Sequence, residues 1–430
     1  MDIKLPYGSK ELSIGLNSDE VEQVISPNNT QLCSNIEKEI FNSLSNPIGC
    51  KSIKEIVLEK SKEKSKNIKD LNLTIICDDN TRLTPADKIL PLLIKMFNLA
   101  GIKNNKIKII MALGTHRDMT ENEMIDKVGI DIFSKIEVIN HSYDNNSRLI
   151  NLGYTKNKTP ISVNKDVYDS DIAIGIGSIV PHHIPGFSGG AKIVQPGVSG
   201  DKTTAYTHLL SVREKRYLLG TVENIVREEM EHIARKVGVD YIFNVVLNQN
   251  GKVYKTFFGD LELAFREGVK ASKEVYQVNV NKKTDVVLAG SHPCDLEFWQ
   301  AHKSLYPADM IVKQKGIIIL VTPCYEGVAK THKDMLEFTN LSYNRINDLV
   351  KKDVIKDKVA AALAMAWAKI KEDVDIIIVS EGISQEEAKS LGFYYEESVE
   401  SAISLAKNIL KKDIKINVLT HAPDILPKIN

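Results

Sequence analysis

Cysteine is scarce in this chain of 430 residues, and its cysteines follow no pairing pattern. They are odd in number, scattered along the chain, and without any CxxC spacing. A disulfide framework or a zinc knuckle needs regular spacing, so the sequence indicates neither. We interpret the five as reduced thiols of the core or of a site lining: Cys33, Cys50, Cys77, Cys294 and Cys324.

A surplus of basic charge is also missing, because 56 lysines and arginines are balanced by 56 aspartates and glutamates. Nucleic-acid-binding proteins and polybasic membrane-binding surfaces need such a surplus. The N-terminal stretch MDIKLPYGSKELSIGL does not have the pattern of a signal peptide, and no apolar run reaches the roughly 18 residues of a transmembrane helix. We therefore expect a cytoplasmic protein whose partner is a small molecule, neither a nucleic acid nor a membrane.

Short β-branched runs alternate with longer amphipathic segments, which is typical of parallel strands joined by crossover helices. This pattern predicts an α/β protein. Strands are expected at Leu73–Cys77, Lys106–Leu113, Ile136–Asn140, Asp171–Ile176, Asp285–Ala289, Gly316–Thr322, Asp375–Ser380 and Lys415–Thr420. Helices are expected at Pro85–Ala100, Glu121–Val128, Thr203–Leu210, Val222–Val237, Trp299–Tyr306 and Lys356–Lys371.

A polar stretch at Tyr276–Thr284 separates a long helix from a fresh series of strands, and we expect a domain boundary there. The prediction is two Rossmann-like domains with a cofactor and substrate cleft between them. Residues 1–275 would form an N-terminal α/β domain that carries cofactor-binding and acid/base residues, and residues 276–410 a C-terminal α/β domain that carries substrate-binding residues. The domain membership of residues 411–430, a strand and tail, stays open.

Polar residues cluster where the expected strands end. The sequence DDNTRLTP (78–85) follows one strand, GTHR (114–117) the next, and GSIVPHH (177–183) a third. A strand of the second half is followed by SHPCD (291–295) and then by EFWQAHK (297–303). Because ligands of open α/β sheets lie beyond the carboxyl ends of the strands, we expect these side chains to meet in one crevice.

The segment Pro181–Gly200 (PHHIPGFSGGAKIVQPGVSG) predicts a loop whose backbone passes close to a ligand, because glycine permits close approach and positive φ. Its GGAK lacks the spacing of a P-loop, and GIG (175–177) lacks the third glycine of a dinucleotide fingerprint. Lys192 ends the glycine run. A lysine in this position is either a phosphate-binding charge or a covalent attachment point.

Five features occur in the order and approximate spacing of one known family: DDNTRLTP (78–85), GTHR (114–117), PHHIPGFSGGAK (181–192), His208 and QAHK (300–303). On these motifs the chain resembles the nickel-pincer-nucleotide-dependent lactate racemase family of 2-hydroxyacid racemases and epimerases. The resemblance implies an isomerase that racemises or epimerises lactate or a related 2-hydroxycarboxylate. It also implies a reaction by reversible hydride transfer through a 2-keto acid intermediate.

The resemblance further implies two cofactor components, nickel and a nickel-pincer nucleotide (pyridinium-3-thioamide-5-thiocarboxylic acid mononucleotide) attached covalently to Lys192. The enzymes that synthesise this nucleotide would be partners. His116 and His182 would be the acid/base residues, and His208 would bind nickel. The remaining implied contacts are Asp79, Gly189 and Gly190 with the cofactor and Arg82, Gln300 and Lys303 with the substrate.

The chemistry explains these residue types. Histidine alternates between acid and base near neutral pH, and arginine and lysine bind a substrate carboxylate. Two alternatives stay open: a nicotinamide-dependent 2-hydroxyacid dehydrogenase, and a non-catalytic protein that binds nickel or a small molecule on the same scaffold. The sequence does not identify the substrate side chain, the oligomeric state or the role of His183. We expect Ile184 and Trp299 to shape the pocket for the side chain.

Overall fold

The computed structural model describes residues 1–213 and 217–429 of the chain. Its first half is built on a six-stranded sheet of strand order β13-β12-β9-β4-β5-β6, in which β13 pairs antiparallel and the other pairs are parallel. The strands are β4 (Leu73–Asp78), β5 (Ile107–Ala112), β6 (Glu137–Asn140), β9 (Ile172–Ser178), β12 (Val239–Leu247) and β13 (Val253–Asp260).

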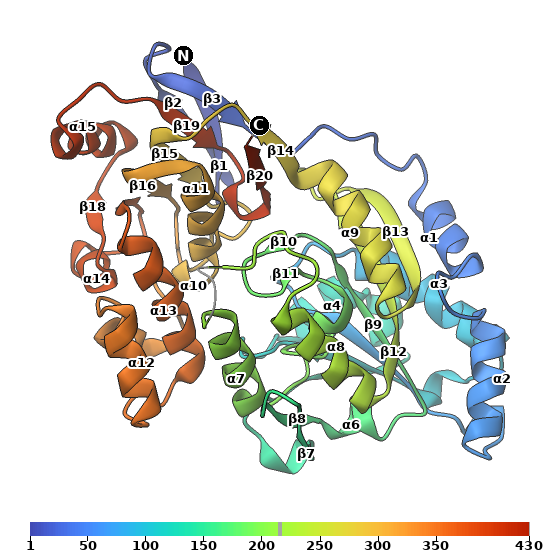
Figure 1. The fold of residues 1–430 in the computed structure, drawn as a ribbon. Coiled ribbons are helices and arrows are strands. Elements are labelled where there is room, and N and C mark those ends of the chain that lie inside the picture. The colour runs from blue at the N-terminus through green and yellow to red at the C-terminus, as the bar shows by residue number, and fades with distance from the viewer. Residues whose placement is uncertain (214–216, 430) are drawn as a thin grey trace.

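A second six-stranded sheet, of order β18-β17-β16-β15-β19-β3, is parallel throughout. Figure 1 shows this sheet and its helices at left, the first sheet at right, and α7, α10 and the β10–β11 hairpin between them. The strands are β3 (Val21–Ile25), β15 (Thr284–Gly290), β16 (Val312–Val321), β17 (Asp375–Val379), β18 (Tyr394–Glu396) and β19 (Ile416–Leu419).

Within the described part of the chain, the other named strands form four two-stranded sheets. They are β1 (Asp2–Tyr7) with β2 (Lys10–Gly15), β7 (Leu149–Tyr154) with β8 (Pro160–Asn164), β10 (Pro181–His182) with β11 (Gly186–Phe187), and β14 (Gln277–Val280) with β20 (Leu426–Ile429). The α-helices are α1 (Ile36–Ser45), α2 (Ile53–Glu63), α3 (Ala86–Leu99), α4 (Glu121–Val128), α5 (Ile130–Phe133), α6 (Lys165–Tyr168), α7 (Asp201–Ser211), α8 (Ile225–Val237), α9 (Leu263–Tyr276), α10 (Phe298–Ala301), α11 (Leu305–Ile311), α12 (Tyr343–Lys351), α13 (Lys358–Lys371), α14 (Gln385–Leu391) and α15 (Val399–Leu410).

Burial explains why the central strands read as continuous apolar runs. All six residues of β4 and all seven of β15 are buried, because helices cover both faces of a parallel sheet. Helix α13, which is buried along nearly its whole length, packs against α7 from the first half. Side chains of the two halves therefore pack together in one hydrophobic core, next to the candidate active site. Among the described residues, no helix combines the length and apolarity that crossing a membrane requires.

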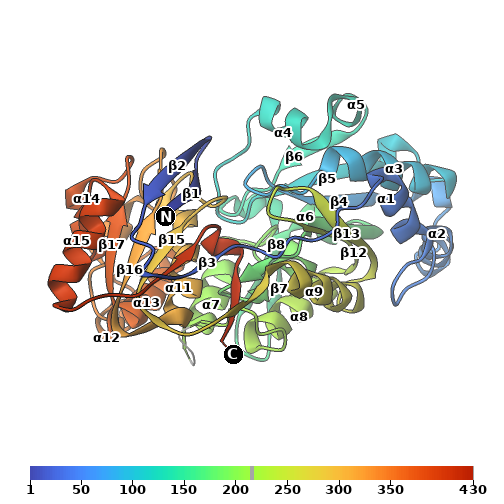
Figure 2. The same ribbon diagram turned by 90° about the horizontal axis from the view of Figure 1, so that it is seen from above.

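The predicted α/β class with parallel sheets is confirmed, and each of the eight expected strands has a counterpart in the two large sheets. The expected domain division stays a prediction, and strand pairing differs from it at the start of the chain. Strand β3 pairs with β19, so residues 21–25 belong to the second sheet. Figure 2 shows the N-terminal segment crossing from that sheet to α1. The run at β3, VEQVI, is too short and too polar to indicate a partner some 390 residues away.

Candidate active site

A cavity of about 120 Å³ lies at the carboxyl ends of β4, β5 and β9, the three neighbouring strands of the first sheet. Polar residues that follow these strands meet residues from α10 and the short 3₁₀ turn after it, which belong to the second half. Nine of the ten predicted site residues line the cavity: Asp79, Arg82, His116, His182, Gly189, Lys192, His208, Gln300 and Lys303. The residues that follow the predicted strands therefore meet at this cavity.

A chain of hydrogen bonds connects the two halves across this cavity. Lys303 Nζ donates to Gln300 Oε1, and Gln300 Nε2 lies 3.1 Å from His116 Nε2. His116 Nδ1 lies 2.6 Å from Asp79 Oδ2. Because a carboxylate only accepts, Nδ1 carries the proton of His116 and Nε2 accepts from the amide. Burial raises the pKa of Asp79, but His116 and Arg82 outweigh it and hold that pKa below its usual value.

His182 belongs to the β10–β11 hairpin and is 8% exposed. Its Nδ1 accepts from the backbone N–H of Ile184 at 3.2 Å, so in the neutral ring the proton resides on Nε2. Burial, helped by the charge of Lys192, lowers the pKa of His182 well below its ordinary value. His182 is therefore neutral at pH 7.

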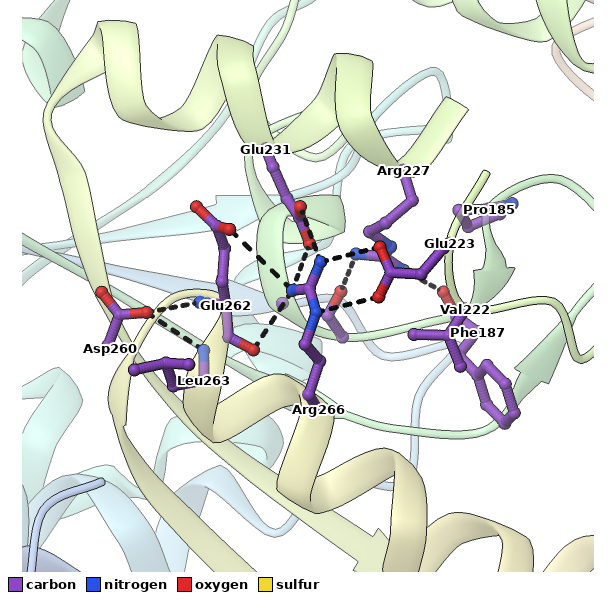
Figure 3. Close-up of polar contacts among 12 residues, drawn as sticks. Pro185, Phe187, Val222, Glu223, Arg227, Glu231, Asp260, Glu262, Leu263 and Arg266 are labelled. Carbon is purple, nitrogen blue, oxygen red and sulfur yellow. Dashed lines mark hydrogen bonds and ion pairs between the residues drawn. The ribbon is translucent and has the colours of Figure 1, made fainter. Parts of the chain in front are cut away.

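The glycine loop is held from behind by Arg227 of α8, which is fully buried (Figure 3). Its guanidinium donates to the carbonyls of Gly189, at 3.0 Å, and of Phe187. The guanidinium carbon lies 4.1 Å from the ring centroid of Phe265. Burial lowers the pKa of Arg227 to about 10, so the side chain keeps its charge at pH 7. Arg227 thus fixes the backbone from which Lys192 projects.

Gly190 is the one predicted cofactor contact whose position does not match the expectation. It does not line the cavity, and its N–H donates to Asn244 Oδ1 at 2.8 Å. Its φ is +57°, and a Cβ would lie 2.9 Å from the ring of Phe265. Gly190 is therefore needed for close packing and positive φ, and the contact predicted for it receives no support from this geometry.

Lys192 lies in the 3₁₀ turn after the glycine run, with its side chain in the cavity. Burial, reinforced by the charges of Arg82 and Lys303, lowers its pKa well below the ordinary value. A neutral amine is a nucleophile, whereas an ammonium is not. Of the two roles left open for Lys192, covalent attachment fits this environment better than a permanent positive charge.

His208, on α7, has one ring nitrogen occupied and one available. Nδ1 lies 2.8 Å from the carbonyl oxygen of Thr204, which can only accept, so Nδ1 carries the proton. Burial lowers the pKa of His208 to about 4. A neutral imidazole whose N–H is fixed by a carbonyl presents its Nε2 lone pair, the arrangement found at metal-ligating histidines.

Two positive side chains remain for an anion. Arg82 and Lys303 both line the cavity, and no hydrogen bond or ion pair to another described residue engages the Arg82 guanidinium. Burial and the charge of Arg82 lower the pKa of Lys303 to about 8, so it is still mainly charged at pH 7. A carboxylate between these groups would satisfy both charges.

Sequence reasoning did not single out Arg227 or Asn244, and it noted His302 only as a neighbour of Gln300 and Lys303. Asn244 and Arg227 act behind the loop, and His302 lines the cavity beside Lys303. One signal was present: Arg227 is spaced from Met230 and Ala234 as one helix face, and both of these are buried. A charged residue on an apolar helix face indicates a buried partner.

Two domain families match the chain, the lactate racemase N-terminal domain over residues 7–220 and the lactate racemase C-terminal domain over residues 279–425. The chain belongs to the lactate racemase family. The lactate racemase of Thermoanaerobacterium thermosaccharolyticum is 26% identical over 439 residues, covering 99% of each chain. That of Lactiplantibacillus plantarum is 28% identical over 330 residues, covering 76% of this chain and 75% of the other.

Solved structures agree at the level of the fold. The lactate racemase apoprotein of T. thermosaccharolyticum covers 100% of both chains with a TM-score of 0.87 and 24% identity. A protein from Thermotoga maritima covers 88% of this chain and 98% of its own, with a TM-score of 0.68 and 20% identity. Lactate racemases are isomerases, and nickel is the metal used in this family. Membership therefore favours an isomerase over the dehydrogenase and the non-catalytic binding protein.

Proposed function

We propose that this chain racemises or epimerises a 2-hydroxy acid, lactate or a related 2-hydroxycarboxylate, by reversible hydride transfer through a 2-keto acid. The observation that carries the proposal is the convergence of nine predicted residues on one cavity. These include two neutral or hydrogen-bonded histidines, a half-buried lysine with a lowered pKa, and two cations suited to a carboxylate.

The residues present fit the nickel-pincer nucleotide. Lys192 has a cavity amine whose lowered pKa favours the nucleophilic form that a covalent bond needs, and His208 has the free Nε2 lone pair that a metal needs. We propose Lys192 as the attachment point and His208 as the protein ligand of nickel, with Asp79 and Gly189 beside the cofactor. When bound, this group would supply the acceptor and donor of the hydride that leaves Cα and returns to it.

The other residues would position the substrate and move its hydroxyl proton. Arg82 and Lys303 would bind the carboxylate, and Gln300 would orient it. His116 and His182 would serve opposite faces of the planar keto acid, one taking the hydroxyl proton and the other supplying it after the keto acid has turned. Asp79 would stabilise the imidazolium that forms when His116 takes a proton.

We also propose the domain architecture, the cellular location and the partners of this protein. The two large sheets would be the centres of two Rossmann-like domains, with the cavity as the cleft between them. The protein would work in the cytoplasm on a small 2-hydroxy acid, and the partners it needs would be the enzymes that make the cofactor. Its holoenzyme therefore requires coexpression with those enzymes.

An isotope experiment on the holoenzyme tests the reaction type. Substrate with deuterium at Cα should racemise with the label retained, because the hydride does not exchange with water. Mass spectrometry of the product measures retention. Solvent hydrogen at Cα in most product molecules would indicate a carbanion mechanism and refute the proposal.

A second experiment tests the attachment. Lys192→Ala should remove both the mass adduct of the intact protein and the activity, since the amine is lost. Lys202→Ala changes an exposed lysine on α7 and serves as the matched control, with adduct and activity unchanged. An adduct of unchanged mass in Lys192→Ala would show that another residue is attached.

A further inference from the structure

A cluster of aromatic and imidazole rings lies beside His182. His183 stacks on His182 with ring centroids 4.7 Å apart and on Tyr306 at 4.1 Å. The ring of His302 meets His183 edge-on, with centroids 5.0 Å apart. His183 and His302 line the same cavity as the predicted acid/base residues. His183 is thus a direct neighbour of the reacting region and does not turn away from it.

Three of the four ring nitrogens of these two histidines have no hydrogen-bond partner among the described residues. Both ring nitrogens of His183 and Nδ1 of His302 are buried without a hydrogen bond to any described residue. His183 is 5% exposed and His302 is 2% exposed. Unsatisfied buried polar groups are costly and rare in native proteins, so a partner from outside the chain is expected at this place.

The charge state of the two rings limits which chemical groups can hydrogen-bond with them. Burial is the main reason that the pKa values of His183 and His302 lie well below the ordinary value, and the charge of Lys303 adds to it. Both rings are therefore neutral at pH 7, and each offers one N–H and one lone pair. A hydroxyl group both donates and accepts and matches this pair. A second carboxylate only accepts, and would leave the lone pairs unmatched.

We propose that His183 and His302 form a subsite that binds a hydroxyl group on the side chain of the 2-hydroxy acid. The proposal rests on the proposed function and deepens it. A substrate whose 2-hydroxyl contacts His182 would place its next carbons against the stacked ring of His183. The preferred substrate would then carry a further hydroxyl near Cα, and the methyl group of lactate would leave the subsite unfilled.

Two acids of nearly equal shape test this subsite on the holoenzyme. 2,3-Dihydroxypropanoate and 2-hydroxybutanoate differ by a hydroxyl in place of a methyl group. We expect kcat/KM to favour the dihydroxy acid by roughly 10²-fold or more, because a site built for a hydroxyl rejects an analogue that lacks it. Calorimetry should show the same preference in binding. A ratio near one in both measurements would overturn the proposal.

His183→Phe then isolates the nitrogens, since phenylalanine keeps the ring stacking. The variant should lose the preference by slowing the dihydroxy acid, with 2-hydroxybutanoate changed by less than about threefold, the spread of a near-neutral substitution. His183→Gln, which keeps a donor and an acceptor, should retain part of the preference. His232→Phe, at an exposed position on α8, is the matched control and should change neither acid.

The outcomes separate this proposal from its foundation. Equal losses on both acids, or loss of the lysine mass adduct in His183→Phe, would show a structural or cofactor-holding role and overturn the subsite. If wild-type protein turns over no 2-hydroxy acid, the proposed function fails, and calorimetric binding of the dihydroxy acid still decides the subsite. If His183→Phe does not fold, His302→Phe is measured in its place and must reduce the same preference.

Discussion

The loop after β5 and the loop after β9 each carry one of the two proposed acid/base histidines, His116 and His182, and they hold it in different ways. In the first loop the side chain of His116 is 22% exposed and is held by other side chains. Its Nδ1–H donates to Asp79 at 2.6 Å, and its Nε2 accepts from Gln300 at 3.1 Å. His116 thus has a carboxylate partner at Nδ1 and a lone pair on Nε2.

In the second loop His182 is buried and held by the backbone. Its Nδ1 accepts from the N–H of Ile184 within the β10–β11 hairpin, and no carboxylate lies within ion-pair distance of it among the described residues. Burial and the charge of Lys192 keep its pKa well below the ordinary value. This histidine presents an N–H to the cavity where His116 presents a lone pair.

The difference shows that two residues of one type can start a symmetric reaction in different states. His116 is ready to receive a proton, because the resulting charge faces Asp79. His182 is ready to donate a hydrogen bond to a substrate oxygen, and it must give up its bond to Ile184 before Nδ1 can be protonated. The two enantiomers of the substrate therefore meet different resting partners.

Removing each histidine in turn should have the largest effect, and it tests whether the two residues have different roles. His116→Ala and His182→Ala should each reduce racemisation by roughly 10²- to 10⁴-fold, the contribution of a positioned acid or base. Because enantiomers have equal free energy, kcat/KM must fall equally in both directions. The informative measurement is therefore single-turnover formation of the 2-keto acid from each enantiomer separately.

Each variant should lose keto acid formation from one enantiomer and keep it from the other, with the two variants affecting opposite enantiomers. The mass adduct and bound nickel serve as controls for an intact cofactor. Equal losses from both enantiomers in either variant would contradict the assignment of the histidines to opposite faces.

Asp79→Asn changes the environment of His116 and leaves the hydrogen bond that holds His182 in place. An amide cannot neutralise the His116 imidazolium, and its N–H₂ favours the tautomer with the proton on Nε2. We expect a loss of roughly 10- to 100-fold, as for other partners that orient a functional histidine. Single-turnover rates should fall for the enantiomer that depends on His116. Asp118→Asn, an exposed change in the loop that carries His116, should leave both rates unchanged.

Much of this site could be predicted because strand ends are local in sequence. The apolar runs of β4, β5 and β9 predict neighbouring parallel strands, and Asp79, His116 and the glycine loop follow them directly. Gln300 and Lys303 come from the second sheet, yet they follow β15 in the same way. Topology then places all these residues on one cavity without any further information.

Long-range pairing could not be predicted in this way. Nothing in VEQVI (21–25) indicates β19 as its partner, and nothing around Asn244 indicates the amide of Gly190. The stack of His183 on Tyr306 depends on how α11 approaches the hairpin. The two histidines could be identified from sequence, but their different tautomers follow from single hydrogen bonds that form only in the folded chain.

Lys303 provides a pH test that leaves both histidines in place. Burial and Arg82 lower its pKa to about 8, so it is charged below pH 8 and loses its charge above it. If its ammonium binds the substrate carboxylate, KM should rise about tenfold from pH 7 to pH 9 as the charged fraction falls. Steady-state kinetics across this range measure the effect. Lys303→Arg, which stays charged, should flatten the profile, and a rise of equal size in that variant would assign the titration to another group.

The smallest expected effect comes from loosening the second loop alone. Ser188 Oγ donates to the carbonyl of Ser178 at 2.7 Å and accepts from the N–H of Val180 at 2.9 Å, which ties the glycine loop to the end of β9. Ser188→Ala removes both bonds and should lower the free energy of unfolding by about 1–3 kcal/mol. Urea unfolding measures this loss. Ser170→Ala removes one hydroxyl bond to Val167 far from the loop and serves as the control.

Because the hairpin that holds His182 follows Val180, the single-turnover rate that depends on His182 should fall by a few-fold in Ser188→Ala, while the rate that depends on His116 should not change. Equal slowing of both rates would mean that the two loops act as one unit.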